Sequence, residues 1–230
     1  MAGTTGLRAL LMGVLAMFAT PAPAGGVLVL DFVATDPGQP VVSSRWTIQP
    51  PWLRIDDGGD GYVLFDDRSR TIYSVVHDDR SILQLRPPGG EQPVVPFALD
   101  AKRAVDAGAP PVAGRVPVRM QYFAEGNDCG GAVVAQGFSG EAVAVALHYR
   151  QALAEQQSSM AIALPEAESP CTQAWSQFAP HWPWADGVPV IEWHADGAQR
   201  ELARFDTDAT VDARLFELPA GYTRLDLSGL

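Results

Sequence analysis

The chain is short of the residues that build compact catalytic or metal sites: its 230 residues include two cysteines, four scattered histidines and one lysine. It contains no Cys-x-x-Cys pair, no His-Glu-x-x-His segment, no P-loop and no Gly-x-Gly-x-x-Gly fingerprint. These absences exclude the thioredoxin-type redox motif, the zincin motif and the common phosphate-binding loops. We therefore expect no metal site and no cofactor.

Positive charge is also scarce in this sequence. Lys and Arg together number 16 against 27 Asp and Glu, so the formal net charge is -11 at pH 7. An acidic protein repels nucleic-acid phosphates, and we expect no nucleic-acid partner. Hydrophobic residues make up 47% of the chain and charged residues 19%, which is typical of a folded domain with a core.

Residues 1–24 have the pattern of a signal peptide. Arg8 precedes the apolar run ALLMGVLAMFAT, which is too short for a comfortable membrane span, and Ala22–Ala24 fits a cleavage site. We predict cleavage before Gly25; the alternative is an N-terminal anchor helix. No later segment is apolar enough to span a bilayer. Residues 25–230 are therefore expected to form one exported domain, periplasmic or secreted, that does not span the membrane.

The two cysteines, Cys129 and Cys171, both lie in the part that is expected to be exported. In an oxidising compartment, an even pair of cysteines indicates a disulfide. Closing a loop of roughly 40 residues gives about 4 kcal/mol of stabilisation in the chain-entropy model. Two isolated cysteines cannot make a closed zinc site, so the disulfide is the better interpretation.

A four-residue segment, Asp-Asp-Arg-Ser, occurs at Asp66–Ser69 and again at Asp78–Ser81, each time before an apolar, β-branched run. A step of twelve residues equals one short strand plus one turn, the spacing of an antiparallel meander. Asp is favoured in turns because its carboxylate accepts a hydrogen bond from the backbone two residues on. We predict two turns here. The alternatives, metal ligands or an acid–base pair, fit the repetition less well.

Apolar runs bounded by turn residues predict further strands along the chain. We expect them at residues 26–35, 41–49, 52–56, 62–65, 71–76, 82–85, 118–126, 132–137 and 187–197, with two extended segments before the C-terminus. One long helix is predicted over Glu141–Met160. Its predicted face consists of Val143, Ala146, Leu147, Arg150 and Leu153.

The stretch from Arg86 to Met120 contains seven prolines, which remove ladder donors and break helices. It predicts a long, mostly irregular connection with one helical turn at Ala101–Val105. Together these elements predict a mainly β (α+β) fold. Its form would be a curved antiparallel sheet, or half-open β-barrel, with one longer helix and a Pro-rich connection.

Two motifs are candidates for a catalytic or a metal site. Gly137–Gly140 (GFSG) is similar to a hydrolase nucleophile elbow, but Glu141 stands where the last glycine belongs. A helix N-cap is the better interpretation of Ser139. Asp56–Gly61 is acidic and Gly-rich but lacks the spacing of a calcium loop, so it predicts a turn. No catalytic residue is therefore assigned.

Aromatic residues on the early strands form the candidate binding site. These are Trp46, Trp52, Phe65 and Tyr73. Aromatic rings belong to a core in most folds, and that alternative stays open. If the rings instead line the concave face of a half-closed sheet, they would hold an acyl chain, a lipid or another apolar ligand.

Several stretches together resemble a group of bacterial exported proteins of unassigned function. They are WLRID at Trp52–Asp56, the hairpins from Gly61 to Leu85, GVPV at Gly187–Val190, and LFELPAGY at Leu215–Tyr222. The fold of that group is similar to the outer-membrane lipoprotein carrier, an unclosed antiparallel β-barrel that curls around short helices over an apolar cavity. The resemblance implies this fold and cavity. The cysteine pair and the long helix depart from the carrier, and no docking surface for its membrane partners is evident.

Three functions are compatible with these features. The first is a periplasmic, non-enzymatic protein that binds a lipid or another apolar ligand, or chaperones an envelope component. The second is a structural or protein-interaction module of the cell envelope, with a filled core and the Pro-rich connection facing a protein partner. The third is a secreted serine hydrolase that uses Ser139.

Overall fold

The structure, a computed structural model, describes residues 26–87, 94–105, 107–161 and 169–227. The predicted signal peptide lies outside the described residues. The strands are β1 (Val27–Thr35), β2 (Val42–Gln49), β3 (Trp52–Asp56), β4 (Gly61–Asp66), β5 (Thr71–Val76), β6 (Ser81–Leu85), β7 (Leu99–Val105), β8 (Val118–Ala124), β9 (Asn127–Ala135), β10 (Val188–His194), β11 (Gln199–Ala209) and β12 (Thr223–Asp226). The helices are α1 (Gly140–Ala161) and α2 (Pro170–Gln173), with the short helical turns η1 (Ala174–Phe178), η2 (Trp182–Trp184) and η3 (Ala213–Phe216).

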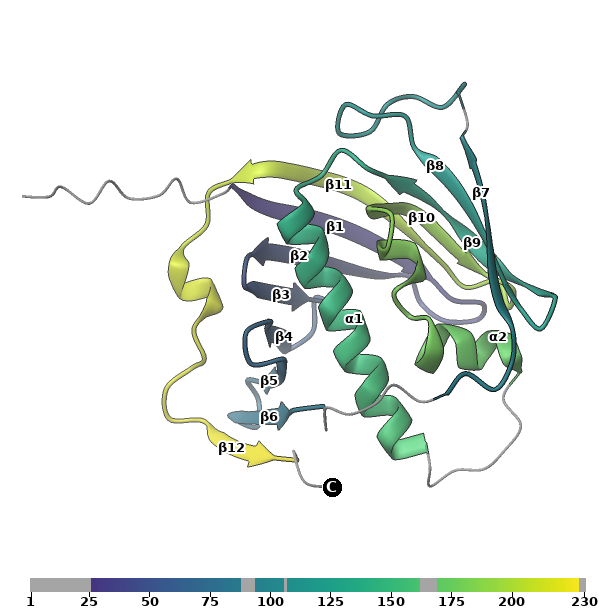
Figure 1. Cartoon of the computed structure of the whole chain (residues 1–230). Helices are drawn as coiled ribbons and strands as arrows, with labels where there is room; N and C mark the ends of the chain where they lie inside the picture. Colours follow the sequence, from purple (N-terminus) through teal and green to yellow (C-terminus); the bar gives the residue numbers. More distant parts are fainter. Residues whose placement is uncertain (1–25, 88–93, 106, 162–168, 228–230) are drawn as a thin grey trace, which may run out of the picture.

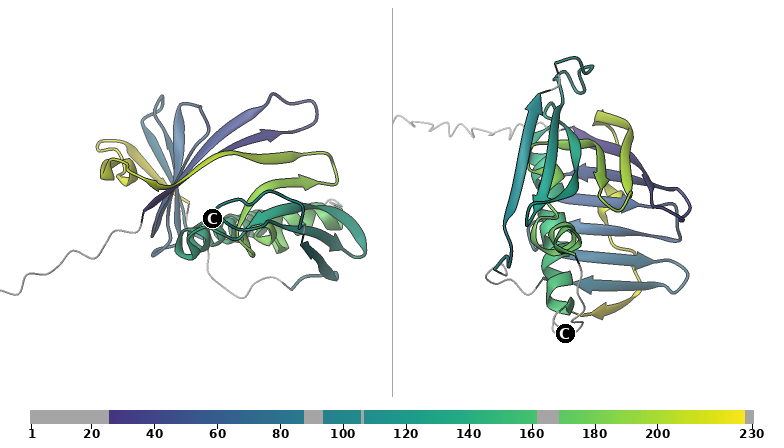
Figure 2. Two further views of the ribbon diagram at one scale, coloured as in Figure 1. Left: turned by 90° about the horizontal axis from the view of Figure 1, so that it is seen from above. Right: turned by 90° about the vertical axis from the view of Figure 1, so that its right-hand side faces the viewer.

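All twelve strands belong to one sheet, in the order β12-β6-β5-β4-β3-β2-β1-β11-β10-β9-β8-β7. Neighbours run antiparallel except β12, which pairs parallel with β6. The sheet curls around α1 but does not close, and β7 and β12 form its two edges (Figures 1 and 2). The predicted fold class is confirmed: a mainly β, mostly antiparallel, unclosed sheet with one long helix.

Helix α1 crosses the concave face of this sheet (Figure 1). Alternate residues of β1, namely Leu28, Leu30 and Phe32, point to the helix and are almost fully buried, as the two-residue period of a strand requires. The helix is 22 residues long, yet within the described part of the chain no helix is apolar enough to cross a membrane.

The buried face of α1 differs from the predicted one. The residues of α1 that are buried in the main core cluster are Ala142, Val145, Ala146, Tyr149 and Ala152. Of the predicted face, only Ala146 is fully buried, while Val143, Leu147 and Leu153 pack at the margin of the core. Small residues let the helix lie close to the sheet, because an alanine adds little width between two backbones. Large aliphatic residues, which define a face in sequence, are displaced to its sides.

The two Asp-Asp-Arg-Ser segments lie at turns, as predicted. The first turn spans Asp67–Arg70 and the second His77–Arg80. Each ends in an arginine with positive φ, 51° at Arg70 and 48° at Arg80. Because these turns are ten residues apart, the structural repeat is shorter than the twelve-residue repeat of the sequence. The Asp-Asp-Arg-Ser segment therefore begins one residue before the first turn but at the second residue of the second turn.

The hydrogen bonds of Asp66 and Asp78 differ between the two turns. Asp66 is the last residue of β4, and its carboxylate accepts hydrogen bonds from the Arg68 amide and the Ser69 hydroxyl. Asp78 lies inside the second turn, where its backbone N–H donates to the carboxylate of Asp60. The prediction that an aspartate carboxylate accepts from the backbone two residues on is confirmed for Asp66. In the second turn the accepting carboxylate is that of Asp60.

The predicted helical turn at Ala101–Val105 is wrong. These residues belong to β7, which pairs along its length with β8, from Leu99 opposite Ala124 to Val105 opposite Val118. A short segment with alanine and basic residues has no strong local preference. Pairing with the free edge of β8 decides its conformation, because it satisfies backbone groups that a single helical turn would leave open.

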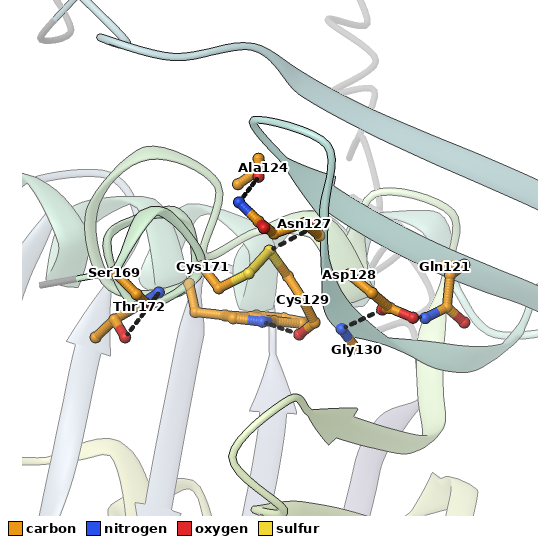
Figure 3. The surroundings of a disulfide bond; sticks show 10 residues. Gln121, Ala124, Asn127, Asp128, Cys129, Gly130, Ser169, Cys171 and Thr172 are labelled. Atoms are coloured by element: carbon orange, nitrogen blue, oxygen red, sulfur yellow. Dashed lines mark hydrogen bonds between the residues drawn. A yellow bond between two sulfur atoms is a disulfide. The ribbon is translucent and has the colours of Figure 1, made fainter.

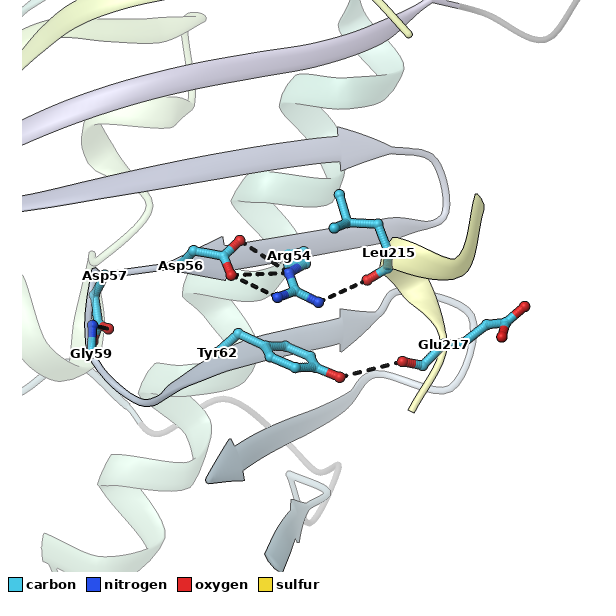
Figure 4. A network of polar contacts seen from close by, with 7 residues as sticks. All are labelled: Arg54, Asp56, Asp57, Gly59, Tyr62, Leu215 and Glu217. Atoms are coloured by element: carbon cyan, nitrogen blue, oxygen red, sulfur yellow. Dashed lines mark hydrogen bonds and ion pairs between the residues drawn. The ribbon is translucent and has the colours of Figure 1, made fainter. Parts of the chain in front are cut away.

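On the convex face, the C-terminal segment after β11 is tied to the early strands (Figure 4). Arg54 of β3 pairs with Asp56 and donates to the carbonyl oxygen of Leu215 at 3.0 Å. The guanidinium lies 3.5 Å from the ring centroid of Tyr62, whose hydroxyl donates to the carbonyl of Glu217 at 3.3 Å. The WLRID, GYVLF and LFELPAGY stretches therefore meet in one contact, which holds the C-terminal segment in place.

Candidate ligand-binding cavity

A cavity of about 350 Å³ lies beside the second half of α1, between that helix, the α2–η1 segment and the β10–β11 turn. Its apolar wall is formed by Leu153, Ala154, Trp175 and Pro180, and by the disulfide residue Cys171. Its polar wall is formed by Arg150, Gln157, Ser169, Thr172, Ser176, His194 and Asp196. The cavity is therefore lined by apolar residues and by ionisable groups together.

The disulfide between Cys129 and Cys171 fixes one wall of this cavity (Figure 3). It joins β9 to the first turn of α2, as the pairing of the two cysteines predicted. Beside it, the indole N–H of Trp175 donates to the carbonyl oxygen of Cys129 at 2.7 Å. The Ser169 hydroxyl caps α2 by accepting from the Thr172 amide. These contacts position the Trp175 ring at the wall.

A buried ion network stands next to the cavity. Glu192 of β10 is 6% exposed and accepts a hydrogen bond from Nη2 of Arg200 at 2.7 Å. Its other oxygen lies 3.9 Å from Nε2 of His194, whose ring stacks on Trp175 with a centroid distance of 4.1 Å. Arg150 of α1 approaches from the opposite side and donates from Nε to the carbonyl of Pro180 at 3.2 Å.

The surroundings of these groups alter their pKa values. Burial raises the pKa of Glu192, but the charges of Arg200, Arg150 and His194 outweigh it, so the net shift is downward and the carboxylate stays ionised. Burial, and next the positive charge of Arg200, lower the pKa of Arg150. Burial also lowers the pKa of His194, which leaves its ring neutral at pH 7.

The four aromatic residues proposed from the sequence lie on two faces of the sheet. Trp46 and Phe65 are buried on the concave face, where both rings pack edge-to-face against Tyr149 of α1. Trp52 and Tyr73 lie on the convex face and pack against the cluster beneath the C-terminal segment. The structure thus does not bring the four together, and none of them lines the cavity beside α1.

A wider groove of about 620 Å³ lies on the convex face, over β1, β2 and the C-terminal segment. Each charged group that lines it already has a close ion pair: Asp31 pairs with Arg45 at 2.7 Å and with Arg204 at 2.9 Å, and Asp56 pairs with Arg54. The hydrogen bond from Arg45 is the main cause of the lowered pKa of Asp31. This groove therefore offers no uncompensated group to a ligand, and the cavity beside α1 is the stronger candidate.

The serine and the histidines that a serine hydrolase would need each contact other partners and do not contact one another. Ser139 is exposed immediately before α1, and its backbone carbonyl accepts from the amide of Val143. His148 instead binds Asp67, with 2.9 Å between Nδ1 and Oδ1, and His77 binds the hydroxyl of Tyr222. Among the described residues, no group of three or more His, Cys, Asp or Glu side chains could hold a metal ion.

Sequence analysis singled out neither Glu192 nor Arg200, and it placed Arg150 on the helix face without a role. Two signals were present in the sequence. Glu192 interrupts an otherwise apolar strand, and Arg150 interrupts an apolar stripe of the helix. A charge in an apolar stripe indicates a buried partner, but the partner comes from another element and sequence spacing cannot name it.

Comparison with known proteins assigns the chain to no family. No family model and no curated protein matches it. Among solved structures, an uncharacterized conserved protein from Thermus thermophilus is similar to it, with 8% sequence identity and a TM-score of 0.45. The match covers 88% of this chain and 91% of that chain.

Proposed function

We propose that this chain is a non-enzymatic protein of the periplasm, or a secreted one, that binds a lipid or another apolar ligand. The observation that carries the proposal is the cavity of about 350 Å³ beside α1, on the inside of an unclosed sheet. Small-molecule sites have volumes from about 300 to 1,000 Å³ and are lined mostly by apolar side chains with a few polar groups. The cavity has this size, and six apolar residues line it beside seven residues with polar side chains.

The physical driving force is the removal of apolar surface from water. Each Å² that a ligand buries against Leu153, Pro180 and Trp175 contributes about 25 cal/mol. The disulfide and the Trp175 hydrogen bond hold this wall in place before any ligand arrives, which lowers the entropic cost of binding. The similarity of the quoted sequence stretches to exported proteins with a lipoprotein carrier-like fold supports the same role.

The test uses the purified mature protein and N-phenylnaphthylamine, a neutral apolar dye that fluoresces when it leaves water. We expect a saturable rise in fluorescence. The variant Ser176→Trp places a large ring in the cavity and should reduce binding at least tenfold. The matched control is Ser43→Trp, which places the same ring in the convex groove and should leave binding unchanged.

Two outcomes would contradict the proposal. The first is the absence of any saturable signal, together with no lipid in the purified protein by mass spectrometry. The second is the reverse pattern, in which Ser43→Trp abolishes binding and Ser176→Trp does not; the ligand would then occupy the convex groove.

A further inference from the structure

The described arginines beside the cavity differ in their partners, and this difference bears on the ligand. Two guanidinium groups, of Arg150 and Arg200, face a single buried carboxylate, that of Glu192. Arg200 makes the close ion pair, at 2.7 Å. The contact that positions Arg150 is with a neutral acceptor, the carbonyl of Pro180. Among the described residues, no close ion pair involves Arg150, and it is this arginine that lines the cavity.

The other ionisable groups on the cavity wall do not cancel this charge. The ring of His194 is neutral at pH 7 because burial lowers its pKa. Asp196 is exposed, and its carboxylate accepts a hydrogen bond from the Ala198 amide within its own turn. A hydrated carboxylate at the surface compensates a buried cation weakly. Arg150 remains protonated, and within the described residues it interacts with Glu192 only at longer range, without a close ion pair.

Burying a cation without a partner costs free energy, and a ligand that supplies the missing anion recovers it. Leu153, Ala154 and Trp175 form the apolar surface next to Arg150, and this surface suits a hydrocarbon chain. The distribution of groups thus has the two parts of an amphiphile: a site for one negative charge and, adjacent to it, a site for a tail.

We propose that the cavity binds a single-chain amphiphile with one anionic head group, a carboxylate, which pairs with the guanidinium of Arg150 while the chain lies along Leu153 and Trp175. This inference names the ligand class of the same cavity and rests on the function proposed above. A guanidinium suits this task because its planar N–H donors match the two oxygens of a carboxylate.

The experiment displaces bound N-phenylnaphthylamine from the mature protein with three ligands of equal chain length: dodecanoate, dodecanol and dodecyltrimethylammonium. Dodecanoate should bind at least tenfold more tightly than dodecanol, the ratio that one charge-assisted hydrogen bond supplies. The cationic ligand should bind most weakly. Because these comparisons use the wild-type chain, they do not depend on how any variant folds.

The variant Arg150→Gln should abolish the preference, so that in this variant dodecanoate and dodecanol bind with equal affinity. Arg150→Lys, which keeps the charge, should keep part of the preference. The matched control is Arg119→Gln, an exposed arginine on β8 that lies over Trp193 outside the cavity. Its ligand preference should equal that of the wild-type protein.

The outcomes separate this inference from the proposed function. Equal affinity for dodecanoate and dodecanol, or tighter binding of the cationic ligand, would overturn the inference and leave an apolar binding protein. Failure of all three ligands to displace the bound dye would overturn the assignment of the cavity. Absence of dye binding in the first place would overturn the proposed function as well. A preference that survives in Arg150→Gln would overturn the role of Arg150.

Discussion

The two ends of α1 face very different surroundings on the concave side of the sheet. Around its first half, the space is filled by rings: Trp46 stacks on Trp184 with 5.2 Å between centroids, and Phe32 and Tyr149 pack edge-on against Trp46. Around its second half, Leu153 borders a cavity of about 350 Å³. We call the ring-packed part the filled end, although a second pocket of about 330 Å³, lined by Val143, Leu147 and Trp184, lies at its margin, and we call the part beside Leu153 the open end.

The difference shows two ways of holding a helix to a sheet. At the filled end, apolar burial stabilises the contact between the helix and the sheet, and Trp184 and Phe32 are almost completely inaccessible to water. At the open end, Arg150 of α1 donates to the carbonyl of Pro180, while the disulfide joins β9 to α2 and the ion pair of Glu192 with Arg200 joins β10 to β11. These connections do not need the space between the elements to be filled. The open end can therefore keep a cavity without losing its shape.

The strongest test of this comparison is Trp46→Ala at the filled end. We expect it to lower the free energy of unfolding by about 5 kcal/mol, the upper range for a buried tryptophan, because the ring contacts three other rings. Urea-induced unfolding measures it. The control is Val41→Ala, whose side chain is 62% exposed and which should stay within about 0.5 kcal/mol of wild type. A loss below about 1 kcal/mol would mean that the filled end is not what stabilises the fold.

The next test removes the covalent connection at the open end. The double variant Cys129→Ala/Cys171→Ala should lose about 4 kcal/mol, since the disulfide closes a loop with a sequence separation of 42 residues. Urea unfolding measures the loss, and wild-type protein under reducing conditions should show a similar one. We also expect weaker dye binding, because the wall that carries Trp175 is no longer fixed. An unchanged urea midpoint would show that packing, and not the disulfide, holds this end.

The smallest expected effect concerns the ion network and its dependence on pH. Glu192→Gln should lower the free energy of unfolding by about 3 kcal/mol at pH 7, because it leaves Arg200 and Arg150 without a buried anion. Glu192 has a folded pKa below its unfolded value of 4.5, so its contribution is complete above pH 4.5. The contribution is lost as the pH falls through the lower, folded pKa.

The difference between wild type and Glu192→Gln should therefore shrink in acid, where a protonated glutamate resembles glutamine. Urea unfolding at pH 7 and at pH 3 measures the two differences. The matched control is Glu201→Gln, on the neighbouring strand β11 and away from the buried ion network, with no expected change at either pH. A difference that does not depend on pH would contradict a buried, ionised Glu192.

Some of this architecture could be predicted from local patterns. The meander from β1 to β6 follows from strand-length apolar runs between turn residues, and the Asp66 and Asp78 turns follow from aspartate chemistry. The disulfide follows from the number of cysteines and the expected compartment. The helix follows from its length and period. Each of these features depends on residues that are close in sequence. The disulfide is the exception, and it could be predicted because two cysteines allow only one pairing.

Other features could not be predicted because they depend on contacts between distant elements. Residues Ala101–Val105 form a strand only because β8 offers a free edge. The face on which each aromatic ring lies depends on strand register, and a shift by one residue reverses the face, so Trp52 and Trp46 end on opposite sides.

The sequence by itself determined the strands and turns of the meander from β1 to β6, the pairing of the two cysteines and the mostly antiparallel sheet, because these properties follow from short-range periodicity and composition. Only the tertiary structure decided that α1 would fill one end of the concave face and leave the other open, and that Arg150 would face the cavity beside Glu192 and Arg200. The physical reason is that burial and electrostatic compensation are properties of groups brought together in space. No local pattern reports which charge will meet which partner.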